Sequence, residues 1–432
     1  MKRSLLLLLS LLFCIHIFSQ SLGLNDAINI ALKNSLNIQI AKNNVAIAGI
    51  NNFYGIAGGL PLINAIGSDV QQLTAIRQEY ANPANNKSSP SVSSNIISGS
   101  MNGSVLIFNG QRVATAKKRL GVTESQSREV LSSRALALVY NVMLKYYDVI
   151  RQQSYARTLE RSIDVSRQKL EIVKTQQSVG MANNADLFQA QVDLNTQLQN
   201  LQAQQLVIDQ DKTDLLTLLT LRPDSTIVIN DTIVVDNSLR LDSIMQAVSA
   251  NPDIAAANEQ ITINQYLEKE VRAQRYPSLS FNAGYNFSRT KNAAGFSLLN
   301  QAYGPFAGLN LAIPIFNGDI YRRQQRIAGI NAGTASLLRD TLVLSYTSNA
   351  VKNYQAYTSN LRQLETAKEN YELSQKLLDL VIQRFQLRQA TIVDVRNAQE
   401  SFENAGFLLI NVSYAAKSAE IQLKRLANRL SW

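Results

Sequence analysis

Histidine and cysteine, the side chains best suited to nucleophilic, acid–base and zinc chemistry at neutral pH, each occur once in these 432 residues. Both Cys14 and His16 lie in the first twenty residues, MKRSLLLLLSLLFCIHIFSQ. Carboxylates are more frequent, but they group only where helices are expected to begin. Outside that opening segment the sequence therefore offers no thiol, zinc or histidine chemistry, and we expect no enzymatic activity, metal site or cofactor.

The opening segment itself has the pattern of a secretory signal peptide. Lys2 and Arg3 precede an apolar stretch that ends at Phe18 and is too short to span a membrane as a helix. Acylation of Cys14, as in a lipoprotein, is the alternative interpretation. We expect residues 1–20 to be removed, which leaves an exported protein without disulfides.

The formal net charge is +10. Lysine and arginine are scattered singly among Gln, Asn and Ser and form no dense basic run, so a solvated surface is favoured over a nucleic-acid partner. No apolar run of eighteen residues follows the opening segment, and no membrane-spanning helix is expected.

The chain contains an internal duplication. The tripeptide Phe-Asn-Gly occurs twice, as Phe108, Asn109 and Gly110 and again as Phe316, Asn317 and Gly318. These copies are 316 − 108 = 208 residues apart, and Asp186 and Asp394 have the same separation. Upstream, Pro61 and Pro277 are 216 apart, so one eight-residue difference reconciles both offsets. The sequence predicts two structural repeats, at about 21–221 and 239–430, joined by a segment at 222–238.

Before each tripeptide the hydrophobic pattern has a period of two, typical of strands. Such alternation suits strands of a membrane barrel, and equally a half-buried soluble sheet. The segment 81–95, ANPANNKSSPSVSSN, is polar and contains proline, so it predicts an exposed loop. The predicted strands are at about 64–79, 96–108, 278–290 and 303–314.

After each tripeptide comes a long segment without proline, with apolar residues at heptad spacing. About 70 residues in a helix span roughly 105 Å. The long helices are predicted at about 111–178 and 319–387, and returning helices at about 184–220 and 392–428. A shorter helix before the first strands is predicted to run to Leu60. The fold class is therefore mainly α, with long coiled-coil helices and four β-strands per chain. Four strands cannot close a barrel, so assembly with further copies is expected.

Together these elements resemble the TolC-type outer membrane efflux and secretion channels. The resemblance rests on the tandem repeat, on Leu-Pro and Tyr-Pro before a strand, on Ile-Phe-Asn-Gly before a long helix, and on ATIVDVRNAQESFENA at residues 390–405. It implies a homotrimer with a twelve-stranded barrel in the outer membrane of a Gram-negative cell, a periplasmic helical tunnel and an equatorial segment around residues 222–240. It also implies a passive exit duct of a tripartite efflux pump or type I secretion system, with a periplasmic adaptor and an inner-membrane pump as partners.

In that family the helical turns form a periplasmic entrance closed by rings of carboxylates. The resemblance implies that Asp394 contributes to the first ring, whereas Asn397 stands where the family has a second aspartate. Ala390 aligns with the family's constricting arginine, and Arg388 is a candidate substitute. Asp186 is the corresponding acid at the first turn. Both acids also fit a capping box at a helix start, which is the alternative role.

The resemblance further implies that Val179, Gly180 and Met181 form a tip where the adaptor docks, with Leu387 in the second copy. Gly180 alone also predicts a helix C-cap. A soluble periplasmic coiled-coil scaffold or adaptor is the alternative function, and it does not account for the pairs of strands. The transported substrate is not indicated.

Overall fold

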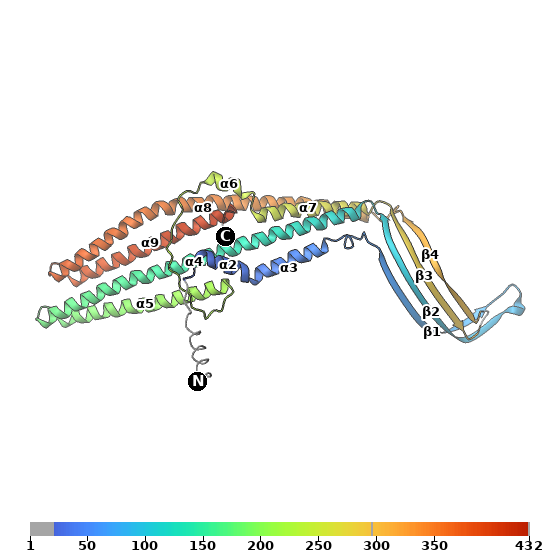
Figure 1. Cartoon of the computed structure of the whole chain (residues 1–432), viewed down its shortest axis with the longest axis horizontal. Coiled ribbons are helices and arrows are strands. Elements are labelled where there is room, and N and C mark those ends of the chain that lie inside the picture. The colour runs from blue at the N-terminus through green and yellow to red at the C-terminus, as the bar shows by residue number, and fades with distance from the viewer. Residues whose placement is uncertain (1–20, 295–296, 431–432) are drawn as a thin grey trace, which may run out of the picture. The chain divides into compact units, whose positions relative to one another are not determined.

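The computed structural model describes residues 21–294 and 297–430, so the predicted signal peptide and Cys14 lie outside the described residues. The elements follow one another in the same order in both repeats (Figure 1). The first repeat contains α2 (Leu24–Asn34), α3 (Leu36–Asn51), β1 (Leu62–Gln78), a short 3-10 helix (Pro83–Asn85), β2 (Lys87–Phe108), α4 (Arg112–Ser178) and α5 (Asn184–Leu218). The second contains α6 (Leu241–Val248), α7 (Pro252–Ala273), β3 (Ser278–Asn292), β4 (Leu299–Ala312), α8 (Ile320–Gln386) and α9 (Ile392–Leu426).

The chain divides into two compact units, and both contain residues of α4 and α8. The first unit comprises residues up to 43, 129–255 and 340 onward, and the second comprises 44–128 and 256–339. Among the described residues, no helix has an apolar stretch long enough to cross a membrane.

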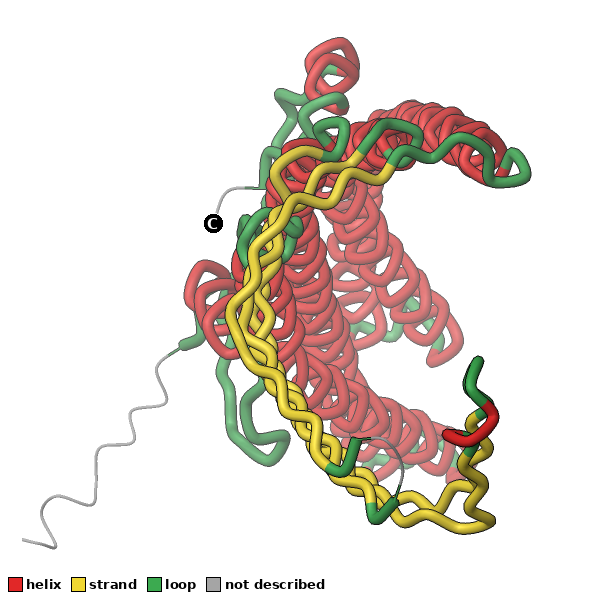
Figure 2. The backbone as a smooth tube through the Cα atoms, turned by 90° about the vertical axis from the view of Figure 1, so that its right-hand side faces the viewer, coloured by secondary structure: helices red, strands yellow, loops and turns green. Residues whose placement is uncertain are grey.

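The four strands of the second unit form one antiparallel, curved sheet in the order β1-β2-β3-β4 (Figure 2). Val105 lies opposite Phe281, which lies opposite Leu309, so one face carries large apolar side chains. The other face carries polar ones, such as Asn282 and Asn310. β1 departs from this rule, because its Asp69 lies opposite Ile97 on the apolar face. The edges of β1 and β4 have no neighbouring strand among the described residues.

The start of β2 corrects the sequence prediction. The strand begins at Lys87, nine residues before the predicted position, and includes much of the polar segment interpreted as a loop. Its pairing with β1 shifts between the pairs Thr74–Val92 and Ile76–Ser89. The extra residue of this bulge accommodates Pro90, which has no N–H for the ladder. Pairing to β1 thus extends a strand whose own side chains give no apolar alternation.

The helix before the first strands is also shorter than predicted, because α3 ends at Asn51 instead of near Leu60. The segment that follows contains Gly55, Gly58 and Gly59, and Gly58 has φ +84°. Glycine raises the entropic cost of continuing a helix and readily takes up left-handed geometry. The glycines therefore end the helix before Pro61.

Both Phe-Asn-Gly sites form the same tight turn between strand and long helix. Gly110 has φ +65° and Gln111 φ +69°, while Gly318 and Asp319 have φ +65° and +60°. Two successive left-handed residues are the geometry of a type I′ turn, and the backbone N–H of the following residue donates to the carbonyl of the asparagine in both copies. The glycine was expected from the sequence, whereas the left-handed geometry of the residue after it was not.

Replacing Gly110 with alanine is expected to destabilise the protein more than the same change at Gly318. Both substitutions place a side chain at φ +65°, at a cost of about 1–2 kcal/mol. At Gly110 the new Cβ also lies 2.7 Å from Cβ of Tyr276, whereas at Gly318 it meets nothing within 4 Å. Overpacking adds about 1–3 kcal/mol. Thermal unfolding of the two variants measures the difference, and equal losses would contradict the role of Tyr276.

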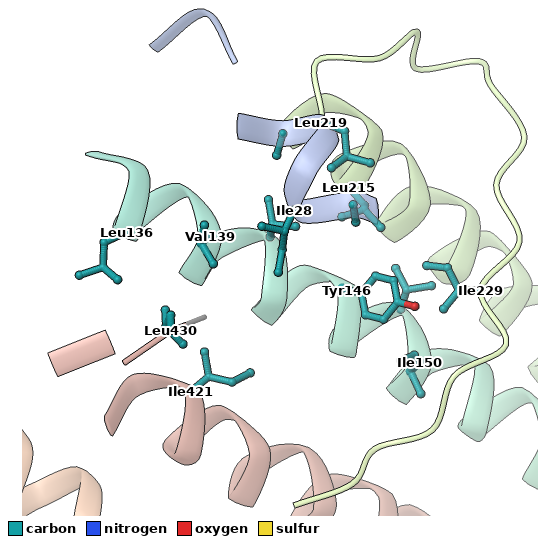
Figure 3. Close-up of a cluster of buried hydrophobic side chains, with 14 residues drawn as sticks. Ile28, Leu136, Val139, Tyr146, Ile150, Leu215, Leu219, Ile229, Ile421 and Leu430 are labelled. Atoms are coloured by element: carbon teal, nitrogen blue, oxygen red, sulfur yellow. The ribbon is translucent and has the colours of Figure 1, made fainter. Parts of the chain in front are cut away.

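The long helices are held by apolar clusters along their buried faces. In the first unit, Tyr146 of α4 is fully buried among Ile28, Val139 and Leu215 (Figure 3). Its hydroxyl donates to the backbone carbonyl of Leu22 at 2.9 Å and to Asp231. Burial, followed by the neighbouring carboxylate, raises the pKa of the Tyr146 hydroxyl. Tyr146 thus serves as a core residue and anchors the inter-repeat segment to α4.

Candidate functional site at the paired helical turns

The turn between α4 and α5 is closed by a Schellman motif. The backbone N–H of Met181 donates to the carbonyl of Gln176 at 2.7 Å, and that of Gly180 to Gln177 at 2.9 Å. Gly180 has φ +73°, the left-handed geometry that this motif requires. The predicted C-cap role of Gly180 is therefore confirmed.

The turn between α8 and α9 has the same hydrogen bonds with a different residue at the critical position. Arg388, 208 residues after Gly180, adopts φ +64°, and Gln389 donates its N–H to Arg384 at 2.7 Å. A side chain in this conformation is strained. The Arg388 guanidinium donates to the backbone carbonyl of Met181 at 3.5 Å, so it links the second turn to the first.

Both helices that leave the turns begin with a capping box. Asp186 closes the box of Asn183 at α5, and Asp394 closes that of Thr391 at α9, as the sequence predicts. The backbone N–H and the hydroxyl of Thr391 lower the pKa of the Asp394 carboxyl, and the positive charge of Arg384 contributes. Because this pKa is lowered, the cap stabilises the fold at pH values above the ordinary carboxyl pKa of 3.8. The stabilisation is lost as the pH falls through the pKa of the folded state.

A shallow hollow beside the second turn has several polar residues in its lining. Asp394 and Asn397 line it from α9, and Arg384 lines it from the end of α8. Asp394 and Asn397 were expected at this site from the sequence, whereas Arg384 was not, although a basic residue in the last turn of a helix is a recognisable signal. Asp186 is not among the described residues that line this hollow.

The turns expose several large apolar side chains. Val179 is 61% exposed, Met181 60% and Leu387 69%, and a Cβ at Gly180 would meet no atom within 4 Å. Exposed large apolar side chains gathered at one end of a bundle are typical of an interaction surface.

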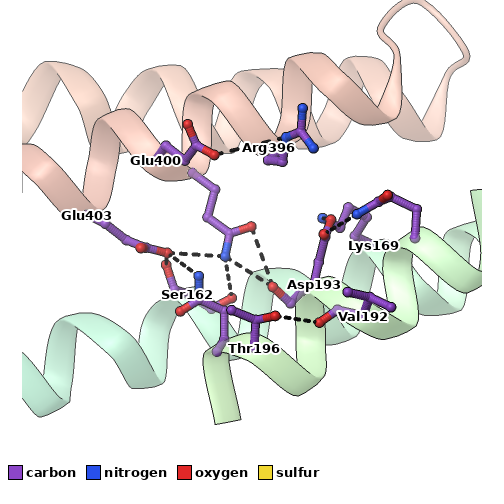
Figure 4. A network of polar contacts seen from close by, with 12 residues as sticks. Ser162, Lys169, Val192, Asp193, Thr196, Arg396, Glu400 and Glu403 are labelled. Carbon is purple, nitrogen blue, oxygen red and sulfur yellow. Dashed lines mark hydrogen bonds and ion pairs between the residues drawn. The ribbon is translucent and has the colours of Figure 1, made fainter. Parts of the chain in front are cut away.

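Farther along the helices a polar network joins α9 to α4 and α5 (Figure 4). Glu403 Oε1 accepts hydrogen bonds from the Ser162 hydroxyl and from the side-chain amides of Gln197, at 2.9 Å, and Gln399, at 3.3 Å. Gln399 also donates to the carbonyl of Ser162 at 3.2 Å and to Ser166 at 3.1 Å. Burial raises the pKa of the Glu403 carboxyl. The network fixes the hairpin that carries Asp394 against the hairpin of the first repeat.

The chain is similar in sequence to known outer membrane export proteins. Residues 243–429 match the outer membrane efflux protein family. Toxin and drug export protein A of Aggregatibacter actinomycetemcomitans is 20% identical over 74% of this chain and 70% of its own length. The pyoverdine export outer membrane protein OpmQ of Pseudomonas aeruginosa is 24% identical over 67% of this chain and 58% of its own.

Solved structures agree in fold over nearly the whole chain. The channel-forming protein CusC has a TM-score of 0.76 at 18% identity and covers 95% of this chain and 93% of its own. The outer membrane protein VceC of Vibrio cholerae has a TM-score of 0.75 at 17% identity, and the match covers 95% of this chain and 97% of VceC. These findings confirm the resemblance inferred from the sequence. Residues 243–429 are therefore similar to the outer membrane efflux protein family, and the chain has the fold of the solved outer membrane channels.

Proposed function

We propose that this chain is the outer membrane exit duct of a tripartite efflux pump or a type I secretion system, through which substrates pass passively out of the periplasm. The observation that carries the proposal is the four-stranded sheet. Its apolar face is largely exposed: Tyr303 and Leu309 are each 67% exposed and Leu311 is 59% exposed. A face of this kind is stable against lipid, and a water-soluble scaffold has no use for it.

The sheet also supports assembly from several copies. β1 and β4 lie at its two edges, and four strands are too few to close a membrane barrel. Three copies supply 3 × 4 = 12 strands, with β4 of one protomer beside β1 of the next, so that no edge stays open. Each strand pair leads through a Phe-Asn-Gly turn into a 67-residue helix, long enough for a tunnel wall below the membrane.

The paired turns supply the entrance in this proposal. Asp394 and Asn397 line the constriction, and Arg384 takes the place of the family's constricting arginine, because Arg384 lines the same hollow as Asp394 whereas Arg388 does not. The exposed apolar tip, formed by Val179, Gly180, Met181 and Leu387, is the docking surface for a periplasmic adaptor that connects to an inner-membrane pump.

Fractionation and conductance test the function directly. The protein is expected in the outer membrane fraction, to require detergent, to have the mass of a trimer in detergent, and to form ion-conducting pores in planar bilayers. A monomer that stays in the aqueous periplasmic fraction supports the scaffold instead.

Replacing Asp394 with alanine is expected to raise single-channel conductance and to weaken block by divalent cations by on the order of tenfold, or about 1.4 kcal/mol. Three symmetry-related carboxylates at a constriction attract cations, and the substitution removes them. Asp186→Ala is the matched control, because Asp186 closes an equivalent capping box but does not line the hollow. Identical conductance and block in both variants would leave Asp394 with the cap alone.

A further inference from the structure

A hollow of about 510 Å³ lies where the strands of the second unit meet its helices. It is lined at the first Phe-Asn-Gly turn by Asn109 and Arg112, and by Gln274 and Tyr276 after α7. Tyr321, near the start of α8, completes its polar lining. These side chains offer a guanidinium, two carboxamides and two phenol hydroxyls, which is a set rich in hydrogen-bond donors.

Several of these donors have no partner within the described part of the chain. The Nδ2 atom of Asn109 is buried and donates to no acceptor there. The exposed guanidinium of Arg112 makes no ion pair or hydrogen bond with another residue of 21–294 or 297–430. Neighbouring cations differ: Arg119 pairs with Glu270 at 2.6 Å, and Arg322 pairs with Asp319 at 3.5 Å. Burying the Asn109 amide without a partner is unfavourable, and an acceptor bound in the hollow would relieve this.

The strand residues that line the hollow all belong to the polar face of the sheet. Leu106 lies opposite Ser280, and Ala312 lies opposite Ser278. Ser278, Ser280 and Asn282 follow one another at intervals of two on β3, so all of these residues are on the same face of the sheet. The hollow is therefore on the side that faces the duct in the proposed function, and away from lipid.

The duplication shows that the fold does not require these residues. At the second Phe-Asn-Gly turn, Ile320 occupies the position of Arg112, since both donate their N–H to the asparagine carbonyl. Leu60 stands 216 residues before Tyr276 and Val113 stands 208 before Tyr321. The second turn thus forms with an apolar residue in place of Arg112, and the first repeat has apolar residues in place of the two tyrosines. The guanidinium and the phenols that line the hollow thus call for a reason other than folding.

We propose that this hollow binds the phosphate or carboxylate group of a dissolved solute in the duct, with Arg112 as the principal anion contact. The planar guanidinium suits a bidentate contact with either group, and Asn109 and the tyrosine hydroxyls donate beside it. The assignment to a solute rests on the proposed function, whereas the anion site itself does not.

Phenyl phosphate is a suitable probe, with phenol as its uncharged counterpart. In planar bilayers, phenyl phosphate is expected to reduce the current through the unmodified channel at concentrations about tenfold lower than through Arg112→Gln, and phenol to affect neither. Arg322→Gln is the matched control, since its arginine lies at the second turn and is already paired. Equal block of the unmodified channel and Arg112→Gln overturns the proposal.

Calorimetric titration of phenyl phosphate into the detergent-solubilised protein separates this proposal from the proposed function. Binding that Arg112→Gln weakens about tenfold supports the anion site even where no channel forms. If the protein forms conducting channels but phenyl phosphate does not bind in the titration, the anion site is overturned and the proposed duct function still stands. Displacement of anionic phospholipid without any response to the soluble ester overturns the assignment to a solute.

Discussion

Replacing Asp193 with asparagine is expected to lower the free energy of unfolding by about 3–5 kcal/mol. Its partner Lys169 has a side chain only 1% exposed, with Nζ 2.5 Å from Asp193 Oδ2. The other carboxylate oxygen accepts from Gln189 at 2.7 Å. The adjacent residues Leu170 and Val173 belong to a buried apolar cluster, so no water is at hand to solvate the ammonium once its counter-ion is gone.

Two controls make this result specific. Glu171→Gln breaks a pair with Lys174 on the same helix whose side chains are 70% and 52% exposed, and it should cost no more than about 1 kcal/mol. The double variant Lys169→Met/Asp193→Asn should recover most of the loss, since no charge then remains buried. Denaturant unfolding followed by circular dichroism gives all three values. A loss at Asp193 no larger than that at Glu171 would falsify the buried-pair interpretation.

The second large effect is expected at Glu403, where alanine should cost about 2–4 kcal/mol. The substitution leaves the Ser162 hydroxyl and the Gln197 amide without their acceptor, at about 1–3 kcal/mol for each unsatisfied buried group. Glutamine keeps an acceptor oxygen in place, so Glu403→Gln should be close to neutral or stabilising at pH 7. Because the network joins α9 to α4 and α5, Glu403→Ala is also expected to loosen the hairpin that carries Asp394.

The same carboxyl predicts a pH dependence with a definite sign. Burial raises the pKa of Glu403, and the hydrogen bonds that favour its charged form offset this only in part. A raised carboxyl pKa contributes stability that is fully present below the ordinary value of 4.5 and is lost as the pH rises through the folded value. Thermal unfolding between pH 4 and 8 should therefore show Glu403→Gln gaining on the unmodified protein as the pH rises. Parallel profiles would contradict the buried charge.

The pKa of Glu403 is raised, whereas that of Asp394 is lowered, and the cause lies in their surroundings. Asp394 is fully exposed and receives hydrogen bonds from Thr391, which favour its charged form. Glu403 also receives hydrogen bonds, but burial outweighs them. Two acids nine residues apart on one helix thus respond to acid in opposite directions, because desolvation dominates at only one of them.

Much of the fold could be predicted because it depends on local sequence. Proline-free heptad segments specify helices such as α4 and α8, and Asn-Gly specifies the turns that precede them. The capping boxes of Asp186 and Asp394 follow from residues three positions apart. The duplication reinforced each of these predictions, since the same local rule had to hold twice.

What the sequence could not decide depends on partners distant in the chain. The extension of β2 to Lys87 comes from pairing with β1, and no alternation in its own residues announces it. Arg388 takes the left-handed position that glycine holds in the first copy, because the turn imposes that geometry and the Met181 carbonyl receives its side chain. Propensity alone would not put an arginine there.

The features of the candidate sites also differ in whether they depend on local sequence or on distant partners. The strands, the two very long helices and the acids at the helix starts could be predicted from residues close together in the chain, and the two repeats from identical residues 208 or 216 positions apart. The packing of distant segments was needed to show that Lys169 is buried, that Arg384 shares a hollow with Asp394, and that Arg112 lines a hollow without a counter-ion among the described residues. Burial and charge environment are set by whichever segments pack alongside, and spacing along one segment carries no information about them.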